Sequence, residues 1–586
     1  MLKSMLQKKG SVYCRLPNSE KWGMFSDPIE ILSANSANEA KNILKSIETY
    51  TAQKKYLCGF ISYEASILFD EAHKVFDNKN FPLIWFAVFA KPPIEIEVED
   101  LDIENNIKLN PEITKDEYLK NIDIIKKYIF DGNIYQANYT FRTYAEKLEN
   151  PVDAFIHLLK NKPPYAAYIN MGDKQIISLS PELFLEKYGS KIKSIPMKGT
   201  AARSAIFLQD KICAKELSLD DKNRAENLMI VDMVRNDFGR ICKTGSISVN
   251  PLFNVDTYPT LHQMTSTVNG ELNQNINFNT ILSATFPAAS ITGAPKIEAM
   301  KIINEVEKTE RKVYTGSIGC ITPENDFCFN VAIRTIINED NIELGIGSGI
   351  VADSQAEKEW EESLLKSRFS SHSNPKFKIF ETILWTKEKG YIYLDEHLSR
   401  MRNSQEYFQR SYNNDSVKQY LNEIIFPDNA EFARVHIEID KNSIPTADYA
   451  ILEKTGWNNE NVKIVISDIK TDSNNLFLYH KTTERELYSK EFQSAVSAGY
   501  DEVIFFNEKD ELTEGSISNI FLKKNNIWYT PKLESGLLPG IWRTSQIEKL
   551  SAIEKKLYRN DLLNADEIII GNSVRGTAKV AKKVSS

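Results

Sequence analysis

Residues Pro196-Met197-Lys198-Gly199-Thr200 place one lysine in a glycine-flanked turn inside an extended, apolar stretch. A free lysine has a pKa of about 10.4, so the neutral amine needed for nucleophilic attack at pH 7 costs roughly 4 to 5 kcal/mol to form unaided. A dry site lowers that cost because it disfavours the ammonium form. The five residues alone are more typical of a surface turn before a hairpin. The residues that accompany them favour a reactive lysine.

The composition indicates a globular protein of several domains. The chain has 586 residues, of which 42% are hydrophobic and 26% charged, which is enough apolar material for large cores. A net charge of −8 without a basic cluster argues against nucleic acid as a partner. The six cysteines show neither metal-ligand spacing nor a disulfide framework. No apolar run has the length of a signal peptide or a membrane span, so we expect a cytoplasmic protein without membrane contact.

A polar stretch beyond the middle of the chain predicts a domain boundary. Residues 367–375 read SRFSSHSNP, and their serines and proline interrupt both helical and strand periodicity. We therefore expect a domain over 1–366, a linker over 367–375 and a second domain over 376–586. Both domains have a mixed α/β (α+β) pattern. The expected elements include strands over 59–63, 175–180, 462–467 and 502–506 and helices over 115–130 and 221–234.

Acidic residues in two predicted helices could form a metal site. Glu226 lies near the start of one helix, and Glu359, Glu362 and Lys366 share one face of another at i, i+3 and i+7. Most such faces are simply solvated, and Glu226 could merely favour the helix dipole. Two carboxylates from separate helices are nevertheless ligands that Mg²⁺ accepts. Glu182 is followed by apolar residues, which would raise its pKa towards that of a general acid.

The first half of the chain resembles the chorismate-utilising enzymes, and among them the aminodeoxychorismate synthases that receive ammonia. The matching segments are GFISYE at 59–64, GNIYQAN at 132–138 and GSGIVAD at 347–353. The similarity covers nearly all of residues 1–366 and is weakest in the first fifty. It implies a fold of layered antiparallel sheets with helices.

This resemblance implies specific roles for the residues around the lysine. Lys198 attacks the chorismate ring while Glu182 protonates the departing hydroxyl, and ammonia then displaces the lysine. Glu226 and Glu362, with Glu359 close by, hold Mg²⁺. Arg334 and Lys366 are implied to pair with the carboxylates of chorismate, and Gly347 and Gly349 are implied to let backbone amides approach them. The implied substrate-binding residues also include Gln136 and Thr292.

Two positions separate this chain from other chorismate-utilising enzymes. Anthranilate synthases carry alanine in place of Lys198, and relatives that use water carry a lysine base in place of Gln136. Both residues therefore favour amination. His262 is implied to lie beside the departing hydroxyl, although a lone histidine is more often a satisfied core residue. Thr292 lies in the segment ASITGAPK at 289–296. Its small residues and glycine are typical of a backbone that approaches a ligand closely, and they are equally typical of a structural turn.

The second half of the chain resembles class IV pyridoxal phosphate enzymes, which include aminodeoxychorismate lyase, D-amino acid aminotransferase and branched-chain aminotransferase. Five segments match in order: FKIFET at 377–382, LDEHLSRM at 394–401, HKTTER at 480–485, LTEGSISNIF at 512–521 and GLLPGIWR at 536–543. The similarity covers about residues 377–580 and implies a D-amino acid aminotransferase-like fold. It is more specific for fold and cofactor than for the reaction.

The same resemblance implies how pyridoxal 5′-phosphate is held. Lys481 forms the Schiff base, and Glu514 pairs with the pyridinium nitrogen. Arg400 and the helix start at Ile541 and Trp542 hold the phosphate, because free amides at a helix start attract anions. Ser518 and Asn519 complete the implied cofactor site.

Together the two halves predict an enzyme that converts chorismate to 4-aminobenzoate, the aromatic unit of folate, with release of pyruvate. The chain has no glutaminase-type cysteine turn, so a glutamine amidotransferase is the expected ammonia source. Alternatives are an anthranilate- or isochorismate-type synthase fused to a class IV aminotransferase, and a non-catalytic binding subunit. The sequence leaves open a homodimer through the C-terminal domain, channelling of the intermediate, an amino acid bound in the N-terminal region, and the identity of the glutaminase.

Overall fold

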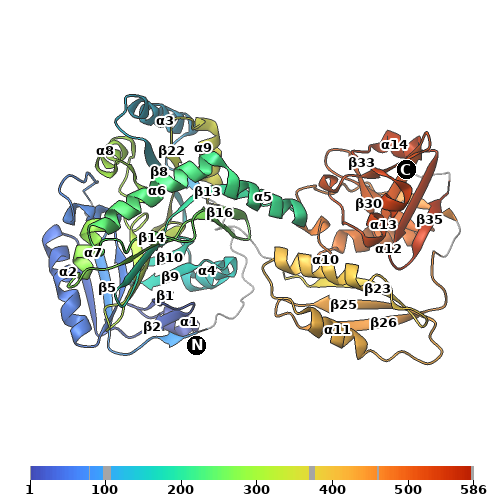
Figure 1. Cartoon of the computed structure of the whole chain (residues 1–586), viewed down its shortest axis with the longest axis horizontal. Helices are drawn as coiled ribbons and strands as arrows, with labels where there is room; N and C mark the ends of the chain where they lie inside the picture. Colours follow the sequence, from blue (N-terminus) through green and yellow to red (C-terminus); the bar gives the residue numbers. More distant parts are fainter. Residues whose placement is uncertain are drawn as a thin grey trace. The chain divides into compact units, whose positions relative to one another are not determined.

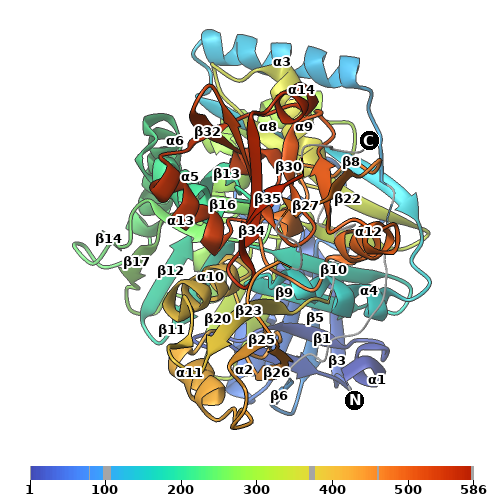
Figure 2. The same cartoon turned by 90° about the vertical axis from the view of Figure 1, so that its right-hand side faces the viewer.

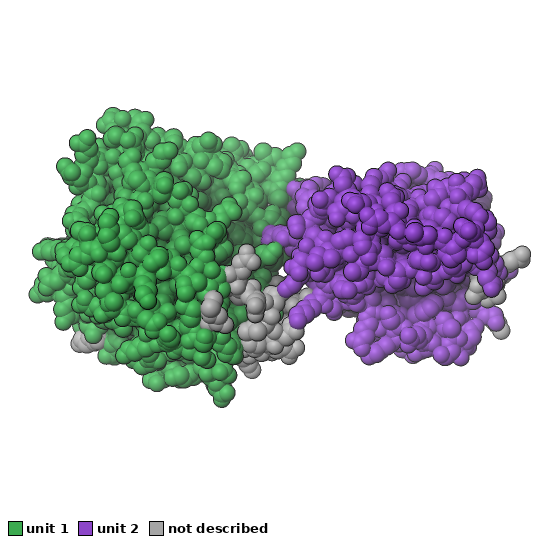
Figure 3. Space-filling view, turned by 90° about the horizontal axis from the view of Figure 1, so that it is seen from below, with its two compact units in different colours: residues 1–201, 214–374 green, residues 202–213, 375–586 purple. Residues whose placement is uncertain are grey.

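The structure is a computed structural model that describes residues 2–77, 80–96, 107, 109–367, 376–457 and 461–581. The chain divides into two compact units (Figure 3). The first contains Met1–Ala201 and Ala214–Asn374, and the second contains Ala202–Cys213 and Pro375–Ser586. No sequence pattern predicted that Ala202–Cys213 groups with the second unit. Only Ser367 of the predicted linker lies among the described residues, so the linker stays a prediction.

Two large antiparallel sheets form the framework of the first unit (Figures 1 and 2). Among the described residues, one sheet has ten strands: β1 (Val12–Arg15), β2 (Trp22–Phe25), β6 (Ile94–Glu95), β7 (Asn110–Pro111), β8 (Gln136–Glu146), β9 (Tyr165–Asn170), β10 (Gln175–Ser180), β18 (Gly293–Ala294), β21 (Thr335–Asn338) and β22 (Asn341–Ile350). The other, within the same described part, has nine: β3 (Glu30–Ala34), β4 (Tyr56–Ile61), β5 (Ile84–Phe89), β11 (Leu183–Tyr188), β12 (Lys191–Ile195), β14 (Ser248–Val249), β17 (Val268–Glu271), β19 (Ser317–Ile321) and β20 (Phe327–Asn330). Strands distant in sequence are neighbours, since β22 pairs along its whole length with residues 137–146 of β8.

Helices cover the outer faces of the two sheets. They are α1 (Leu2–Leu6), α2 (Ala37–Ala52), α3 (Lys115–Phe130), α4 (Pro151–Leu158), α6 (Asp221–Gly239), α7 (Phe278–Thr285), α8 (Lys296–Val306) and α9 (Ala356–Leu365). A further helix, α5 (Phe207–Leu219), begins in the segment that groups with the second unit.

Three apolar clusters explain this layering. Side chains from both sheets, such as Val12, Phe60 and Ile176, form a core between them. A second cluster packs α3, α4, α8 and α9 against the ten-stranded sheet, and a third packs α2, α6 and α7 against the nine-stranded sheet. Each sheet therefore buries both faces, one against the other sheet and one against helices. The predicted layered antiparallel sheets with helices are confirmed.

Local signals set several element boundaries. In α3, Thr114 caps the first turn by accepting from the Glu117 amide, and Tyr118, Ile122 and Ile125 form the buried stripe. The predicted bounds of α3 and β10 are confirmed. The strand predicted over 59–63 instead spans Tyr56–Ile61, because the chain enters a 3₁₀ turn at Tyr63.

The second unit has three smaller sheets. Within the described residues, the first sheet contains β23 (Ile379–Thr386), β24 (Gly390–Tyr391), β25 (Phe432–Ile439) and β26 (Pro445–Leu452). The second contains β27 (Asn461–Val462), β31 (Asn519–Lys524), β32 (Ile527–Pro531), β33 (Ile553–Lys555), β34 (Glu567–Asn572) and β35 (Gly576–Val580), and the third contains β28 (Ile464–Ile466), β29 (Glu502–Phe506) and β30 (Leu512–Gly515). The helices are α10 (Leu394–Tyr407), α11 (Asn414–Asn422), α12 (Glu486–Ser497), α13 (Ile541–Leu550) and α14 (Arg559–Leu563). Helices and strands occur together in this unit, as the mixed α/β pattern predicted, and its strand pairs are both parallel and antiparallel.

Candidate active sites

Lys198 lies in a strand rather than in the predicted turn. The strand, β13 (Met197–Ala202), forms a small sheet with β16 (Leu261–Thr265) and β15 (Asn254–Thr257). Gly199 has φ +95°, a left-handed conformation that favours glycine, so the glycine next to the lysine bends the strand. Other side chains hold the backbone on both sides: Gln263 Nε2 donates to Gly199 O at 2.7 Å, and Asn227 Nδ2 donates to Lys198 O at 3.4 Å. The sequence analysis missed Gln263 and Asn227. In the sequence, only the presence of an amide side chain among apolar residues indicated that either one has a specific role.

The lysine amine lies against the backbone of Gly349. A methyl group built on Gly349 would overlap Lys198 Nζ and lie 3.0 Å from Gln136 Nε2. The structure therefore brings Lys198, Gln136 and Gly349 together. Gln136 is fully buried, and neither atom of its amide has a hydrogen-bond partner within the described residues. Because buried polar groups are normally paired, this amide indicates a place for a ligand.

Burial moves the lysine and its acidic neighbour towards their neutral forms. Burial lowers the pKa of Lys198; Glu226, Glu362 and Glu359 oppose this effect, and Lys366 adds to it. Glu182 is 3% exposed, and burial raises its pKa to about 7 against the opposing effects of the Met197 amide and Lys198. A lysine with a lowered pKa, near enough to affect a carboxyl with a raised pKa, suits nucleophilic attack with acid assistance.

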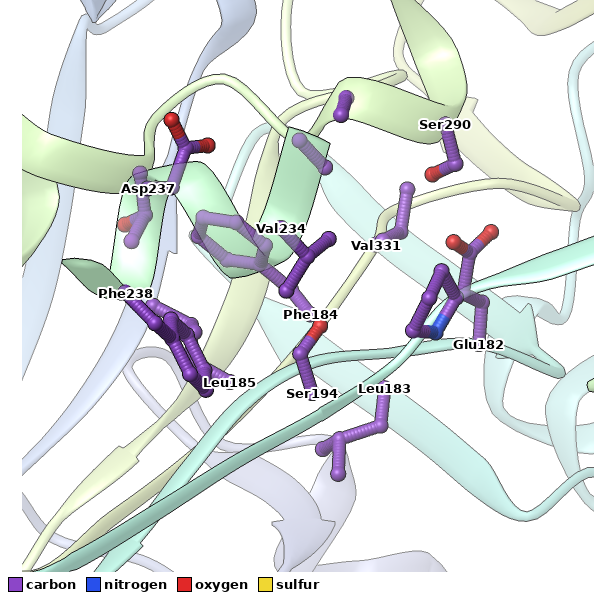
Figure 4. A pocket seen from close by; sticks show the side chains of 14 residues that line it. Glu182, Leu183, Phe184, Leu185, Ser194, Val234, Asp237, Phe238, Ser290 and Val331 are labelled. Atoms are coloured by element: carbon purple, nitrogen blue, oxygen red, sulfur yellow. The ribbon is translucent and has the colours of Figure 1, made fainter. Parts of the chain in front are cut away.

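Glu182 also borders a pocket that Ser194, Pro196 and residues of α6 help to line. Figure 4 shows Glu182 and Ser290 on one side of this pocket and Asp237 and Phe238 on the other, with Val234 between them. The Ser290 hydroxyl lies close to the Glu182 carboxyl but not in hydrogen-bonding geometry.

The predicted metal ligands come from α6 and α9, close enough to Lys198 to affect its pKa. The predicted charged face of α9 is present: Lys366 Nζ lies 2.8 Å from Glu362 Oε1 and donates to Gly347 O at 3.0 Å. In the described part of the chain, no group of three or more histidine, cysteine or acidic side chains could hold a metal ion. The magnesium site at Glu226, Glu359 and Glu362 therefore stays a prediction.

Three other predicted residues of the first unit are buried near the same elements. His262 is 1% exposed on β16, where its Nδ1 lies 3.0 Å from Thr257 Oγ1. The Thr292 hydroxyl donates to Ala288 O at 3.1 Å, and its carbonyl accepts from the Asn138 amide at 2.7 Å. Arg334 has φ +51°, and burial lowers its pKa. Their assigned contacts with a substrate stay predictions.

In the second unit, Lys481 is surrounded by charged side chains. Its carbonyl accepts from the Phe380 amide at 2.9 Å, and its amine lies 4.6 Å from the centre of the Phe380 ring. Burial lowers the pKa of Lys481 to about 7, with further lowering by Arg485 and Arg400. This lysine is therefore partly neutral near pH 7, as a reactive amine must be.

A buried glutamate fixes Arg400, the predicted phosphate ligand. Glu381 is fully buried and accepts from Arg400 Nε at 2.8 Å, Arg400 Nη2 at 2.7 Å and His397 Nδ1 at 2.7 Å. The charges of Arg400 and His397 overcome the cost of burial and lower the pKa of Glu381. The sequence analysis missed Glu381, although an acidic residue within the apolar strand KIFETIL was a signal.

Glu514 is held by four donors. Arg485 Nη2 lies 3.4 Å and Tyr488 Oη 3.3 Å from Glu514 Oε1, while Asn519 Nδ2 and the Leu538 amide donate to Oε2 at 3.0 and 3.1 Å. Burial nevertheless raises the pKa of Glu514 to about 7. A carboxyl fixed in this way can face a ring nitrogen without moving.

The remaining predicted cofactor residues lie around β31 and α13. Ser518 is already engaged, since its hydroxyl donates to Glu502 Oε2 at 2.6 Å. Ile541 and Trp542 begin α13, and Gly540 before them provides no side-chain cap, so the first amides are open to an anion. A methyl group on Gly540 would overlap Asn519 Oδ1, so the backbone here passes close to that side chain. A buried amine, a fixed carboxyl, an arginine and an uncapped helix start fit pyridoxal phosphate.

Comparisons with protein families agree with both sites. Residues 103–371 match the family described as chorismate binding enzyme, and residues 378–582 match amino-transferase class IV. The two matches lie one after the other along the chain and do not overlap. The class IV amino-transferase domain implies pyridoxal phosphate as its cofactor.

Curated relatives match the chorismate binding domain. Chloroplastic aminodeoxychorismate synthase of Arabidopsis thaliana is 38% identical over 274 residues, which are 46% of this chain and 30% of that protein. Aminodeoxychorismate synthase component 1 of Escherichia coli (strain K12) is 37% identical over 271 residues, 46% of this chain and 59% of that protein. Anthranilate synthase component 1 1 of Haloarcula marismortui is 36% identical over 274 residues, 46% of this chain and 56% of that protein. The chain thus spans less than two thirds of the length of each of these relatives.

A solved structure supports the fold of the same domain. Anthranilate synthase component I from Streptococcus pneumoniae TIGR4 matches with a TM-score of 0.52 and 24% identity, over 62% of this chain and 93% of that chain. Within the described residues, no helix combines the length and apolarity needed to cross a bilayer.

Proposed function

We propose that this chain makes 4-aminobenzoate from chorismate in two steps. The chorismate binding domain replaces the ring hydroxyl with an amino group, and the class IV domain then eliminates pyruvate from the aminodeoxychorismate. The observation that carries this proposal is the amine of Lys198, placed against Gln136 and Gly349 beside a glutamate whose pKa burial raises to about 7. Relatives named aminodeoxychorismate synthase support the first step.

In the first step, Lys198 Nζ attacks the ring as a neutral amine. Glu182 gives its proton to the departing hydroxyl, which leaves as water, and ammonia then displaces the lysine. His262 lies on the strand that neighbours β13 and faces the departing hydroxyl. The carboxylates of chorismate bind the cationic and amide groups of the site, with Gln136, Thr292, Arg334, Gly347, Gly349 and Lys366 as the binding residues.

The carboxylates of Glu226, Glu359 and Glu362 would hold Mg²⁺. Their oxygen atoms are ligands that magnesium prefers, and the ion keeps other positions for water or a ligand. Bound there, magnesium would supply positive charge for a carboxylate of chorismate.

In the second step, pyridoxal phosphate supplies an electron sink when it is bound. Lys481 would hold the cofactor, and its Nζ would take the proton from the carbon next to the substrate nitrogen. Glu514, whose carboxyl four donors hold in place, would pair with the ring nitrogen. Arg400 and the α13 amides would hold the phosphate, with Ser518, Asn519, Ile541 and Trp542 completing the site.

The proposed chemistry requires a source of ammonia. A glutamine amidotransferase subunit would supply it, because the chain has no cysteine in a glutaminase-type nucleophile turn. We place the reaction in the cytoplasm and propose a homodimer formed through the class IV domain.

Product identification tests the proposed function. The full chain is incubated with chorismate, ammonium chloride, Mg²⁺ and pyridoxal phosphate, and 4-aminobenzoate and pyruvate are expected in equal amounts. The similarity to an anthranilate synthase makes one alternative specific. Anthranilate or salicylate as the product would refute the first step, and amino transfer to a keto acid without pyruvate release would refute the second.

A further inference from the structure

The segment Ala202–Cys213 belongs to one domain by sequence and to the other by structure. It lies inside residues 103–371, which match the chorismate binding family. In the structure it groups with residues 375–586, the unit that contains the class IV domain (Figure 3). The strand β13 ends at Ala202, so the segment continues directly from the strand that carries Lys198. The contacts that hold the segment therefore act within the second unit.

A buried ion pair and two apolar side chains shape the segment. Arg203 Nε donates to both carboxylate oxygens of Asp210 at 2.8 Å, and the Ser204 amide donates to Asp210 Oδ1 at 2.9 Å. The side chains of Arg203 and Asp210 are each 6% exposed. Between these two residues, Ala205 and Ile206 pack against an apolar cluster of the class IV domain that contains Leu478, Tyr479, Tyr488, Ala495, Val503 and Phe505. The segment is thus part of the packed interior of this unit.

Arg203 also binds Tyr407, the last residue of α10. Its guanidinium carbon lies 4.1 Å from the centre of the Tyr407 ring, and its Nη2 donates to Tyr407 O at 3.1 Å. Carbonyls in the last turn of a helix lack a partner within the helix, so this cation also stabilises the end of α10. A second ion pair lies nearby, with Lys211 Nζ 2.6 Å from Glu406 Oε1.

Tyr407 packs against His480, the residue before Lys481. The two ring centres are 4.5 Å apart, and His480 Nδ1 lies 3.0 Å from Ser404 Oγ. His480 is 2% exposed. Burial lowers its pKa to about 3, and the backbone of Ala205 opposes this effect, so Ala205 lies close to the ring. The His480 ring is therefore enclosed by α10 and by the segment.

His480 fixes the chain where it enters Lys481. On the other side of the lysine, the Phe380 amide donates to Lys481 O at 2.9 Å, and the Thr483 amide donates to Lys378 O at 3.0 Å. Hydrogen bonds to residues 378–380 thus hold the backbone from Lys481 onwards, and the packing of His480 holds it before Lys481. Because adjacent Cα atoms stay about 3.8 Å apart, a shift of His480 would also displace Lys481.

We propose that Ala202–Cys213 is a positioning segment for the pyridoxal phosphate site, supplied to the class IV domain by the chorismate binding part of the chain. Asp210 holds Arg203, Arg203 holds Tyr407, and Tyr407 holds His480 beside Lys481. The class IV domain thus depends on residues that the predicted boundary at 366 assigns to the first domain. The proposal needs only cofactor binding, so it can be tested whichever reactions the two domains catalyse.

The first experiment breaks the ion pair of the segment and measures the affinity for the cofactor. The full chain, freed of cofactor by dialysis, is titrated with pyridoxal phosphate, and the dissociation constant is taken from the visible absorbance. Arg203→Ala should raise this constant by about tenfold, within the range for residues joined in one network of contacts. Arg203→Lys keeps the charge but lacks the planar group that lies on the Tyr407 ring, so its constant should be intermediate. An unchanged constant in Arg203→Ala would overturn the proposal.

Two control variants separate this effect from a general loss of stability. Lys187 Nζ lies 3.0 Å from Asp326 Oδ1 in the first unit, and the two side chains are only 13% and 12% exposed. Lys187→Ala should lower the midpoint of thermal unfolding but leave the dissociation constant of the cofactor unchanged. Leu208 belongs to the segment but is 68% exposed, so Leu208→Ala should change neither quantity. An equal rise of the constant in Arg203→Ala and Lys187→Ala would overturn the proposal.

The second experiment uses the unaltered chain, so it does not depend on the folding of a variant. Backbone hydrogen exchange is followed by mass spectrometry with and without pyridoxal phosphate. The Asp210 amide donates to Ile206 O at 2.8 Å, so opening of the segment exposes this amide. A ligand that binds only the closed state stabilises it, so the cofactor should slow exchange in residues 202–213 by about threefold or more and leave α3 unchanged. Equal exchange with and without cofactor, or equal slowing in α3, would overturn the proposal.

Discussion

Replacing Gly349 with alanine should displace the amine of Lys198 without disturbing the fold. The new Cβ would lie 2.2 Å from Lys198 Nζ, whereas carbon and nitrogen atoms in contact are about 3.5 Å apart. The Nζ atom would therefore have to move by more than about 1 Å. The atom that it meets is the end of a flexible side chain. Gly349 also lacks a left-handed φ, so alanine introduces no backbone strain.

The displacement sets the expected loss of activity. A misplacement of about 1 Å in a reacting group costs roughly 100-fold in rate, so kcat for amination should fall by about 100-fold, equivalent to about 2.7 kcal/mol. KM for chorismate should change less than kcat, because Arg334 and Lys366, the proposed cationic partners of its carboxylates, remain. The midpoint of thermal unfolding should stay within a few degrees of the wild-type value.

Amination is measured from chorismate and ammonium chloride, and unfolding is followed by circular dichroism. Gly347→Ala is the matched control, since its methyl group would overlap Tyr139 O and lie 2.7 Å from Thr140 Cα. Backbone atoms in the middle of a sheet cannot move aside, so this variant should lose stability. Activity of Gly349→Ala within threefold of wild type, in a folded protein, would show that the working amine does not lie against this glycine.

Four further predictions concern the charged residues of the two sites. Lys198→Ala should stop amination but leave pyruvate release from added aminodeoxychorismate unchanged, and loss of both activities would contradict separate sites. Glu381→Gln should remove the carboxylate that orients Arg400 and weaken the affinity for pyridoxal phosphate by about tenfold, or about 1.4 kcal/mol. The visible absorbance of the protein during dialysis measures the loss of the cofactor. Glu438→Gln, which breaks a partly exposed ion pair with Lys378, is the control. Amination should decline as the pH rises through about 7, because Glu182 acts in its protonated form and burial raises its pKa to about 7. The raised pKa of Glu182 stabilises the folded state fully at pH values below about 4.3, the pKa of a glutamate in the unfolded chain, and this contribution is lost as the pH rises through about 7. Glu182→Gln should therefore gain stability relative to wild type above pH 7. Denaturant unfolding of both proteins at two pH values measures this difference.

Local patterns predicted the elements that carry the sites. The bounds of α3, β10 and β29 follow from side-chain periodicity and match the prediction. Four predictions were wrong in detail: β4 begins and ends earlier than expected, Lys198 lies in a strand, α6 extends beyond 234 to Gly239, and the strand predicted over 462–467 is divided between β27 and β28. At β4 and at Lys198, pairing with strands distant in sequence decides the conformation, and a local pattern contains no information about that pairing.

The reacting residues were predicted, whereas the residues that fix them were not. Lys198 and Lys481 stood in recognisable segments. Gln263, Asn227 and Glu381 act through hydrogen bonds to partners 16 to 64 residues away, so only the folded chain reveals what each one holds. A polar side chain within an apolar run was the sole sign of each.

The two lysines reach their reactive states through different surroundings. Burial lowers the pKa of both, but the neighbours of Lys198 are mainly carboxylates, whereas two arginines assist the lowering at Lys481. The carboxylates near Lys198 are the proposed ligands of Mg²⁺, which would offset their negative charge where the carboxylates of chorismate bind. Arginines near Lys481 suit a site that binds a phosphate-bearing cofactor, since their positive charge attracts the anion and releases the proton of the amine. The charge of the expected ligand therefore explains the charge of each lysine's neighbours.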